Sequence, residues 1–180
     1  MDGRASEPAD KIYMPKGGVG VVDVDSRRVA CSLVTARGVY CLLDDKTFGP
    51  YSDAGMPEVH PESGLATWMA RTGNQWTVVV EGEAHATYDG LLPGSPCVSP
   101  DGRRIAYGAK RGKDWFVVID REAHGLYRGL LKDTPRFSGD SQRVIWAAQG
   151  TFGWLVYANG KKEGRALDDK ELKAIIHRLS

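Results

Sequence analysis

The sequence lacks any apolar stretch long enough to cross a membrane. No run of apolar residues approaches the roughly 18 that a spanning helix requires. The N-terminal sequence MDGRASEPADKIYMPKGG has no apolar core of signal-peptide length. We therefore expect a cytoplasmic protein without a membrane partner.

An excess of one charge is also missing. The chain has 24 lysine and arginine residues against 23 aspartate and glutamate residues, a formal net charge of +1. Proteins that bind nucleic-acid phosphates are usually strongly basic, so this balance argues against a nucleic-acid partner. The length of 180 residues and the apolar fraction of 42% fit one globular domain with a core of its own.

Cysteine is scarce, and its spacing does not suit a metal site. Of the three cysteines, Cys31 and Cys41 are expected on neighbouring strands of one hairpin, and Cys97 lies far from both in the sequence. Zinc needs closely spaced cysteine and histidine ligands, which this sequence does not supply. We predict small, buried or half-buried thiols in a reducing compartment, with no metal site and no cofactor.

A catalytic motif is absent as well. The chain has no G-x-S-x-G sequence, which would expose a serine nucleophile on a sharp turn. Serine, histidine and aspartate are present, but no spacing links them as a nucleophile and its base. The sequence therefore predicts no catalytic residues and a protein that is not an enzyme.

What the sequence has instead is a repeat with a period of about 40 residues. Residues 96–134 align with residues 39 positions earlier and later, so that Trp76, Trp115 and Trp154 fall in register. His85 and His124 also share one position of the repeat, which explains them without a shared metal. An identical place in each unit indicates that the three tryptophans pack between units.

Each unit is expected to contain four short strands. In the best copy they are Cys97–Ser99, Arg104–Ala109, Trp115–Ile119 and a weaker outer strand near Gly125–Arg128, with a polar loop at Lys110–Asp114. The third strand is apolar on both faces, so both faces must be covered. We predict an all-β fold, a β-propeller of about four four-stranded blades within residues 11–168. The blades are expected at 19–56, 57–95, 96–134 and 135–168, after a flexible N-terminus at 1–10.

The turn between the first two strands carries a family resemblance. SPDGRRIAY (99–107) and its weaker copies SGDSQRVIW (138–146) and HPESGLATW (60–68) resemble the SPDGK-x-IAF repeat of the TolB-like, or WD40-like PD40, propellers. The resemblance implies a propeller whose first strands line a central channel. It implies no single activity, since such propellers serve as interaction platforms or as substrate-filtering domains attached to serine peptidases.

The closure of the ring depends on segments at its ends. Lys11–Met14 is short and alternating, and we predict that it adds a strand to the edge of the last blade and latches the ring. Three alternatives stay open: one chain closes the ring, two chains build a larger one, or the chain is a piece of a longer protein.

A short C-terminal helix is predicted at residues 169–180. Asp168 and Glu171 have the spacing of a capping box. One face of the helix is apolar, so we expect it to cover either the last blade, which we favour, or a partner. That face consists of Leu172, Ile175, Ile176 and Leu179.

Two sets of residues are candidates for function. One polar position at the end of each first strand could line the channel or merely stabilise the following turn; it is occupied by Asp23, His60, Ser99 and Ser138. Basic residues on the loops expected at one face would form a rim that attracts anions. The basic candidates are Arg71, Lys110, Arg111, Lys113 and Lys132.

These observations favour a non-catalytic β-propeller binding or scaffold module that presents its loop faces to a protein or an anionic ligand. We expect a protein partner and either a monomer or a homodimer that completes a larger ring. One alternative is a substrate-gating propeller domain or accessory of a serine hydrolase. The other, with weaker support, is an enzyme that works in the channel.

Overall fold

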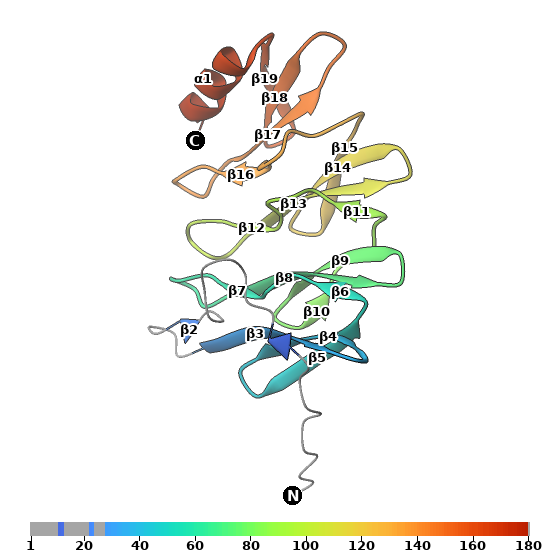
Figure 1. Ribbon diagram of the computed structural model, residues 1–180. Helices are drawn as coiled ribbons and strands as arrows, with labels where there is room; N and C mark the ends of the chain where they lie inside the picture. The colour runs from blue at the N-terminus through green and yellow to red at the C-terminus, as the bar shows by residue number, and fades with distance from the viewer. Residues whose placement is uncertain (1–10, 13–21, 24–27, 180) are drawn as a thin grey trace, which may run out of the picture. The chain divides into compact units, whose positions relative to one another are not determined.

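The computed structural model describes residues 11–12, 22–23 and 28–179, which form antiparallel β-sheets and one helix (Figure 1). The all-β fold class with a short C-terminal helix is therefore confirmed. The flexible segment predicted for residues 1–10 lies outside the described residues. The chain divides into two compact units, of which the first comprises 1–74 and 78–84 and the second 75–77 and 85–180.

The first two sheets belong mostly to the first unit. The first has the strand order β1-β3-β4-β5, with β2 also paired to β3. Its strands are β1 (Lys11–Ile12), β2 (Val22–Asp23), β3 (Arg28–Thr35), β4 (Gly38–Leu43) and β5 (Lys46–Tyr51). The second has the order β10-β9-β8-β6, with β7 also paired to β8. Its strands are β6 (Asp53–Ala54), β7 (Glu58–Val59), β8 (Ala66–Thr72), β9 (Gln75–Val80) and β10 (Glu83–Ala84).

The other two sheets and the helix α1 (Asp169–Leu179) lie in the second unit. The third sheet has the order β11-β13-β14-β15, with β12 also paired to β13. Its strands are β11 (Gly90–Leu91), β12 (Cys97–Val98), β13 (Ile105–Arg111), β14 (Asp114–Ile119) and β15 (Glu122–Tyr127). The fourth has the order β16-β17-β18-β19. Its strands are β16 (Arg136–Phe137), β17 (Val144–Gln149), β18 (Trp154–Ala158) and β19 (Lys161–Ala166).

One edge of each of the first three sheets is formed by two short strands. In the third sheet, β11 pairs with the end of β13 and β12 pairs with its start. Because β11 precedes residue 96, the sheet begins several residues before the unit predicted at 96–134. The same shift occurs in the second sheet, since β6 lies within the predicted unit 19–56 but pairs with β8.

The predicted latch at Lys11–Met14 is wrong. Lys11 pairs with Val34 and Ile12 with Leu33, so residues 11–12 form β1 of the first sheet and not a strand of the last one, and residues 13–14 lie outside the described residues. Its place beside the end of β3 matches the place of β11 beside the end of β13. The segment is the first half of the split edge of its own sheet.

The second and third strands are longer than predicted. The polar loop expected at Lys110–Asp114 contracts to a tight turn, because Arg111 pairs directly with Asp114. Gly112 makes this turn possible with a φ of +60°, a conformation that other residues rarely adopt. The three cations of this segment therefore lie on a hairpin and not on a long loop.

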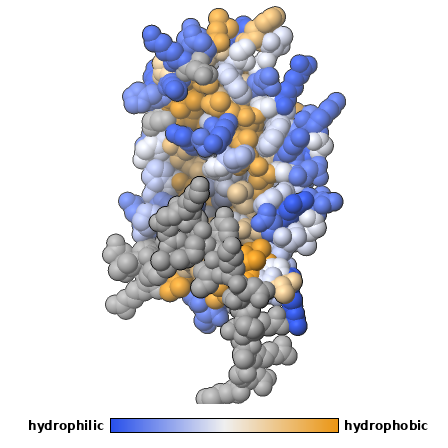
Figure 2. Space-filling model, viewed as in Figure 1, coloured by the Kyte–Doolittle hydropathy of each residue, from blue (hydrophilic) through white to orange (hydrophobic). Residues whose placement is uncertain are grey.

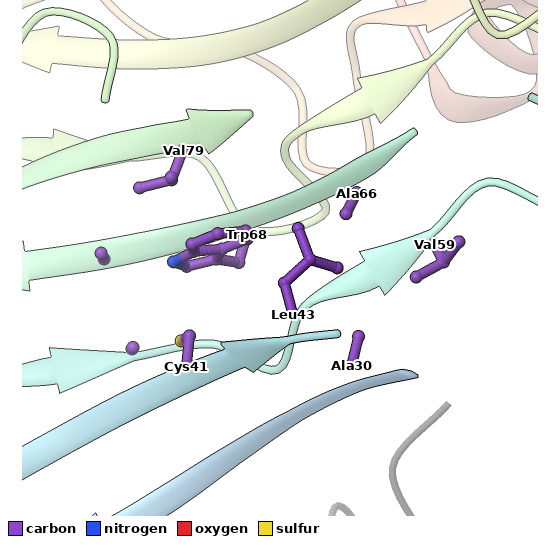
Figure 3. Close-up of a cluster of buried hydrophobic side chains, with 9 residues drawn as sticks. Ala30, Cys41, Leu43, Val59, Ala66, Trp68 and Val79 are labelled. Atoms are coloured by element: carbon purple, nitrogen blue, oxygen red, sulfur yellow. The ribbon is translucent and has the colours of Figure 1, made fainter. Parts of the chain in front are cut away.

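The core of the first unit lies between its two sheets. Figure 3 shows Trp68 of β8 and Val79 of β9 on one side and Cys41 and Leu43 of β4 on the other. Trp68 is 2% exposed and its ring lies 5.3 Å from that of Phe48. A buried aromatic side chain removes more surface from water than most other side chains do, so Trp68 contributes strongly to the stability of this core.

The second unit has two cores. One lies between the third and fourth sheets and includes Val117 of β14 and Trp146 of β17. The other lies between the fourth sheet and α1, where Ile145 and Val156 contact Leu172 and Leu179 among others. Figure 1 shows α1 beside β17–β19. The predicted apolar helix face is therefore confirmed, and it covers the chain's own last sheet.

Asp168 caps α1 as predicted, but Glu171 bonds back to the amide of Leu167 and not to that of Asp168, so only half of the predicted capping box is confirmed. The amide of Glu171 donates to Asp168 Oδ1 at 2.8 Å. In return, Glu171 Oε2 accepts a hydrogen bond from the amide of Leu167, also at 2.8 Å. One of the amide groups that a helix start leaves without partners, that of Glu171, is thus satisfied, and the second bond ties Glu171 to the residue before the cap.

Two aromatic positions recur with the sheets. Trp76, Trp115 and Trp154 are all half-buried, and Trp115 and Trp154 pack at the margins of the two cores of the second unit. The deepest aromatic side chains occupy another position of the same period, for which no burial was predicted from the sequence. These side chains are Trp68, Tyr107 and Trp146.

Candidate anion-binding sites

The two serines of the recurring polar position hold turns. The buried Ser99 hydroxyl donates to Asp101 Oδ1 at 2.5 Å and accepts from the Arg104 amide at 2.9 Å. Ser138 repeats both contacts, with Asp140 at 2.5 Å and the Arg143 amide at 2.9 Å. These bonds favour the turn-stabilising alternative for both serines.

Each of these serines also lowers the pKa of a neighbouring carboxyl group. The Ser99 hydroxyl is the main cause that lowers the pKa of Asp101, with help from the amide of Arg103. The Ser138 hydroxyl lowers the pKa of Asp140 in the same way. Both carboxylates are therefore acceptors within their own turns.

The other two residues at this recurring polar position are His60 and Asp23. His60 Nδ1 lies 3.1 Å from the Ser63 hydroxyl, within the turn that joins β7 to β8. Asp23 pairs with Arg28 in the β2–β3 ladder. The contact of His60 again favours a role in its own turn.

A second polar position recurs directly after β4, β9, β14 and β18, and it was not predicted from the sequence. Its side-chain oxygen accepts a hydrogen bond from an amide at the start of the neighbouring strand, and its own amide donates back to the carbonyl oxygen of the same residue. These neighbouring residues are Val29 of β3, Ala66 of β8, Ile105 of β13 and Val144 of β17. The residues are Asp44, Glu81, Asp120 and Asn159, all with φ between +48° and +57°. Arginines add ion pairs at three of these four positions, since Arg28 bonds both Asp44 and Glu81 and Arg104 bonds Asp120. The signal that could have revealed the position is one polar residue directly after each apolar third strand.

The histidines of the repeat have separate surroundings. His85 Nδ1 lies 3.2 Å from the Tyr107 hydroxyl. His124 lines a hollow of about 380 Å³ together with Arg104, Asp120, Glu122, Ile119 and Asn159. Among the residues that the structure describes, no group of three or more histidine, cysteine, aspartate or glutamate side chains could hold a metal ion.

The three cysteines are free thiols, and Cys31 and Cys41 lie on the neighbouring strands β3 and β4 as predicted. Burial raises the pKa of Cys41 to about 11 and that of Cys97 to about 11. A thiol with such a pKa is protonated at neutral pH, and the thiolate is the reactive form. These two side chains are poor nucleophiles.

Three of the predicted basic residues meet at the β13–β14 hairpin. The Lys110 ammonium group lies 5.8 Å from the centre of the Trp115 ring, and the Arg111 guanidinium group lies 5.3 Å from that of Tyr88. Such positions over aromatic faces are favourable for cations. Lys113 is exposed at the turn itself. Among the described residues, none of the three cations forms an ion pair with a carboxylate.

Arg71 and Lys132 lie elsewhere. Arg71 belongs to the first unit, on β8, and its Nη2 lies 3.4 Å from Asn74 Oδ1. Lys132 lies beside α1 in the second unit, where it lines a pocket of about 440 Å³. The other residues that line this pocket are Leu131, Asp133, Thr134, Arg136, Lys173, Ile176 and His177. Arg136, Lys173 and His177 were not among the predicted site residues, because they become neighbours of Lys132 only through the packing of the helix.

Comparisons with protein-family models, with curated protein sequences and with solved structures found no significant match. Within the described part of the chain, no helix is long and apolar enough to cross a membrane. The proposal for a function therefore rests on the geometry of the described residues. It offers two groups of cations without ion-pair partners among the described residues, one at the β13–β14 hairpin and one in the pocket beside α1.

Proposed function

We propose that this chain is a non-catalytic binding module of the TolB-like propeller-repeat type, whose four sheets are its blades. In this proposal the tip of the β13–β14 hairpin binds an acidic surface of a protein partner. The single observation that carries it is the cluster of Lys110, Arg111 and Lys113, whose charges no described carboxylate neutralises by an ion pair.

The hairpin tip is ordered by its own neighbours. The Gly112 amide donates to Asp89 Oδ2 at 2.6 Å, and Arg111 donates to the Thr87 carbonyl oxygen at 3.2 Å. Binding costs less free energy when side chains and loops are already in place. An ordered tip that carries three cations is therefore suited to a complementary acidic surface.

The rest of the surface supports a charge-mediated contact. Figure 2 shows hydrophilic residues mainly along the two sides of the face in view and hydrophobic residues nearer its middle. Only a few large hydrophobic side chains are exposed among the described residues: Val29, Leu126, Phe152 and Leu167. Partners that bind mainly through apolar contact need larger continuous patches.

The described polar groups also favour binding over catalysis. The hydroxyls of Ser99 and Ser138 are buried and engaged in their turns. The thiols of Cys41 and Cys97 are protonated at neutral pH. A covalent mechanism needs an exposed nucleophile with a base beside it, and none of these four side chains meets that condition.

Charge reversal at the hairpin tip tests the proposal. The probe is a short fluorescent polyglutamate peptide, and its dissociation constant is measured by fluorescence anisotropy. We expect the double variant Arg111→Glu and Lys113→Glu to bind the peptide about tenfold more weakly than the wild type, because two attractive contacts become repulsive.

A matched control is available on the β18–β19 hairpin. Lys161 and Lys162 are both exposed, and their double replacement by glutamate changes the net charge by the same amount. The control variant should keep most of the wild-type affinity. Equal weakening in the two variants would show that only net charge matters, and the proposed site would then be wrong.

A further inference from the structure

The pocket beside α1 is distinct from the hairpin tip and is not needed for the proposed function. It lies between the segment 131–136 and one side of α1. Its volume of about 440 Å³ is within the range of pockets that hold small molecules. Both walls belong to the second unit of the chain.

Positive charge dominates the lining of this pocket. Lys132, Arg136 and Lys173 contribute three formal charges, and Asp133 contributes the only carboxylate among the lining residues. The Asp133 carboxylate lies against Gly94, since a Cβ atom at Gly94 would be 2.9 Å from Asp133 Oδ1. Among the described residues, none of the three cations forms an ion pair.

Both walls of the pocket are held by the fold. On one side, the Leu131 amide donates to Ala147 of β17, and the Thr134 amide and hydroxyl bond the Leu131 carbonyl oxygen. On the other side, Leu172 and Leu179 anchor α1 in the core. Lys173 and His177 are four residues apart on that helix, so they lie on the same side of it.

The chemistry of the lining selects a class of ligand. A guanidinium group and two ammonium groups suit an oxyanion with more than one negative charge. A phosphomonoester carries about −1.5 to −2 at neutral pH, which matches the excess of two positive charges in the lining. Leu131 and Ile176 add apolar surface to the same pocket.

We propose that the pocket formed by Lys132, Arg136 and Lys173, with Leu131 and Ile176 as its apolar wall, binds the phosphomonoester group of a small molecule with an apolar body. The Arg136 Nε already donates to the Asp133 carbonyl oxygen at 2.7 Å, which orients the guanidinium group. The two lysines complete the oxyanion site from opposite walls.

Isothermal titration calorimetry with phenyl phosphate tests this proposal on the full chain. We expect phenyl phosphate to bind more tightly than inorganic phosphate, because only the former has an apolar body. The double variant Lys132→Glu and Lys173→Glu should lose at least about tenfold in affinity for phenyl phosphate. The control variant Lys161→Glu and Lys162→Glu should bind like the wild type.

Three results would overturn the proposal: no binding of phenyl phosphate by the wild type, equal affinity for phenyl phosphate and inorganic phosphate, or equal binding by the pocket variant. Unfolding of both double variants is measured alongside; if the pocket variant does not fold, the milder Lys132→Ala replaces it. A phosphotyrosine peptide that binds more tightly than phenyl phosphate would support the site and identify a phosphorylated protein as its source. Weaker peptide binding would support a free small molecule.

The proposal for the hairpin tip and the proposal for the pocket can be overturned independently of each other. The pocket variant should retain wild-type affinity for the polyglutamate peptide, and the hairpin variant should retain wild-type affinity for phenyl phosphate. Loss of phenyl phosphate binding in the hairpin variant would assign the phosphate to the hairpin tip and overturn the pocket proposal.

Discussion

A buried hydroxyl organises one turn in each of the third and fourth sheets. Ser138 is fully buried, donates to Asp140 and accepts from the Arg143 amide. Removing the hydroxyl leaves that amide without the acceptor it has in the native turn. An amide left without its partner inside a protein costs free energy, so the serine matters for stability.

We predict that Ser138→Ala lowers the free energy of unfolding by about 1–3 kcal/mol at neutral pH. In the folded protein the Ser138 hydroxyl holds the pKa of Asp140 below its usual value. Such a carboxyl stabilises the fold above its unfolded pKa, and this contribution disappears as the pH falls through its folded pKa. The deficit of Ser138→Ala should therefore shrink in acid.

Urea unfolding of wild type and Ser138→Ala, at neutral pH and below the folded pKa of Asp140, measures this effect. Asp140→Asn and the double variant complete a thermodynamic cycle. A deficit that is the same at both pH values, with no coupling in the cycle, would show that the serine does not act through Asp140.

At the level of single residues, the sequence predicts only part of the chemistry. The turn serines could be recognised because SPDG and SGDS repeat with a fixed spacing. The second polar position, directly after β4, β9, β14 and β18, was missed for two reasons. Its residue type varies, and its first spacing is 37 rather than 39 residues. It is occupied by Asp44, Glu81, Asp120 and Asn159. The pocket residues Arg136 and Lys173 lie far apart in the sequence, and only packing brings them together.

Among the elements, α1 is the one whose position is best explained. Its start is fixed by the hydrogen bonds between Asp168 and Glu171 and their neighbours, and its apolar side packs on the fourth sheet. Leu172 is 3% exposed in that contact. The helix therefore contributes both to stability and to one wall of the phosphate pocket.

We predict that Leu172→Ala lowers the free energy of unfolding by about 3 kcal/mol, as expected for a large apolar side chain removed from a core. Lys170→Ala is the matched control, because Lys170 is exposed on the same helix and alanine is a good helix former. Urea denaturation measures both. A loss no larger than that of the control would mean that α1 does not pack on the sheet in solution.

Elements with a strong periodic signal were predictable, and short ones were not. The helix has an apolar side with a period near 3.6 and the sequence spacing of a capping box, so its bounds were nearly right. The segment Lys11–Met14 was assigned to the wrong sheet, because a two-residue strand has too few side chains to specify its partner. The loop at 110–114 was predicted too long, because Gly112 allows a tighter turn than a polar composition suggests.

In the molecule as a whole, the repeated residues and the unrepeated residues have different roles. The repeated positions support the sheets, through Ser99 and Ser138 at the turns and through the deep aromatic side chains such as Trp146. The cations of the hairpin tip and of the pocket do not recur in all four sheets. We infer that the repeat provides the scaffold and that the unrepeated charges provide the binding surface.

The near-zero net charge makes this inference testable. A chain with a formal net charge of +1 should attract acidic partners only through local clusters. Salt screens exposed charges over about 8 Å at physiological ionic strength, so binding through such clusters weakens as salt is added.

The most direct test of the account is a titration of the wild-type chain with the polyglutamate peptide at low and at physiological ionic strength. We predict clear binding at low salt and a dissociation constant that rises by about tenfold or more at physiological salt. Absence of binding at low salt, or an affinity that does not change with salt, would contradict the claim that this is a charge-mediated binding module.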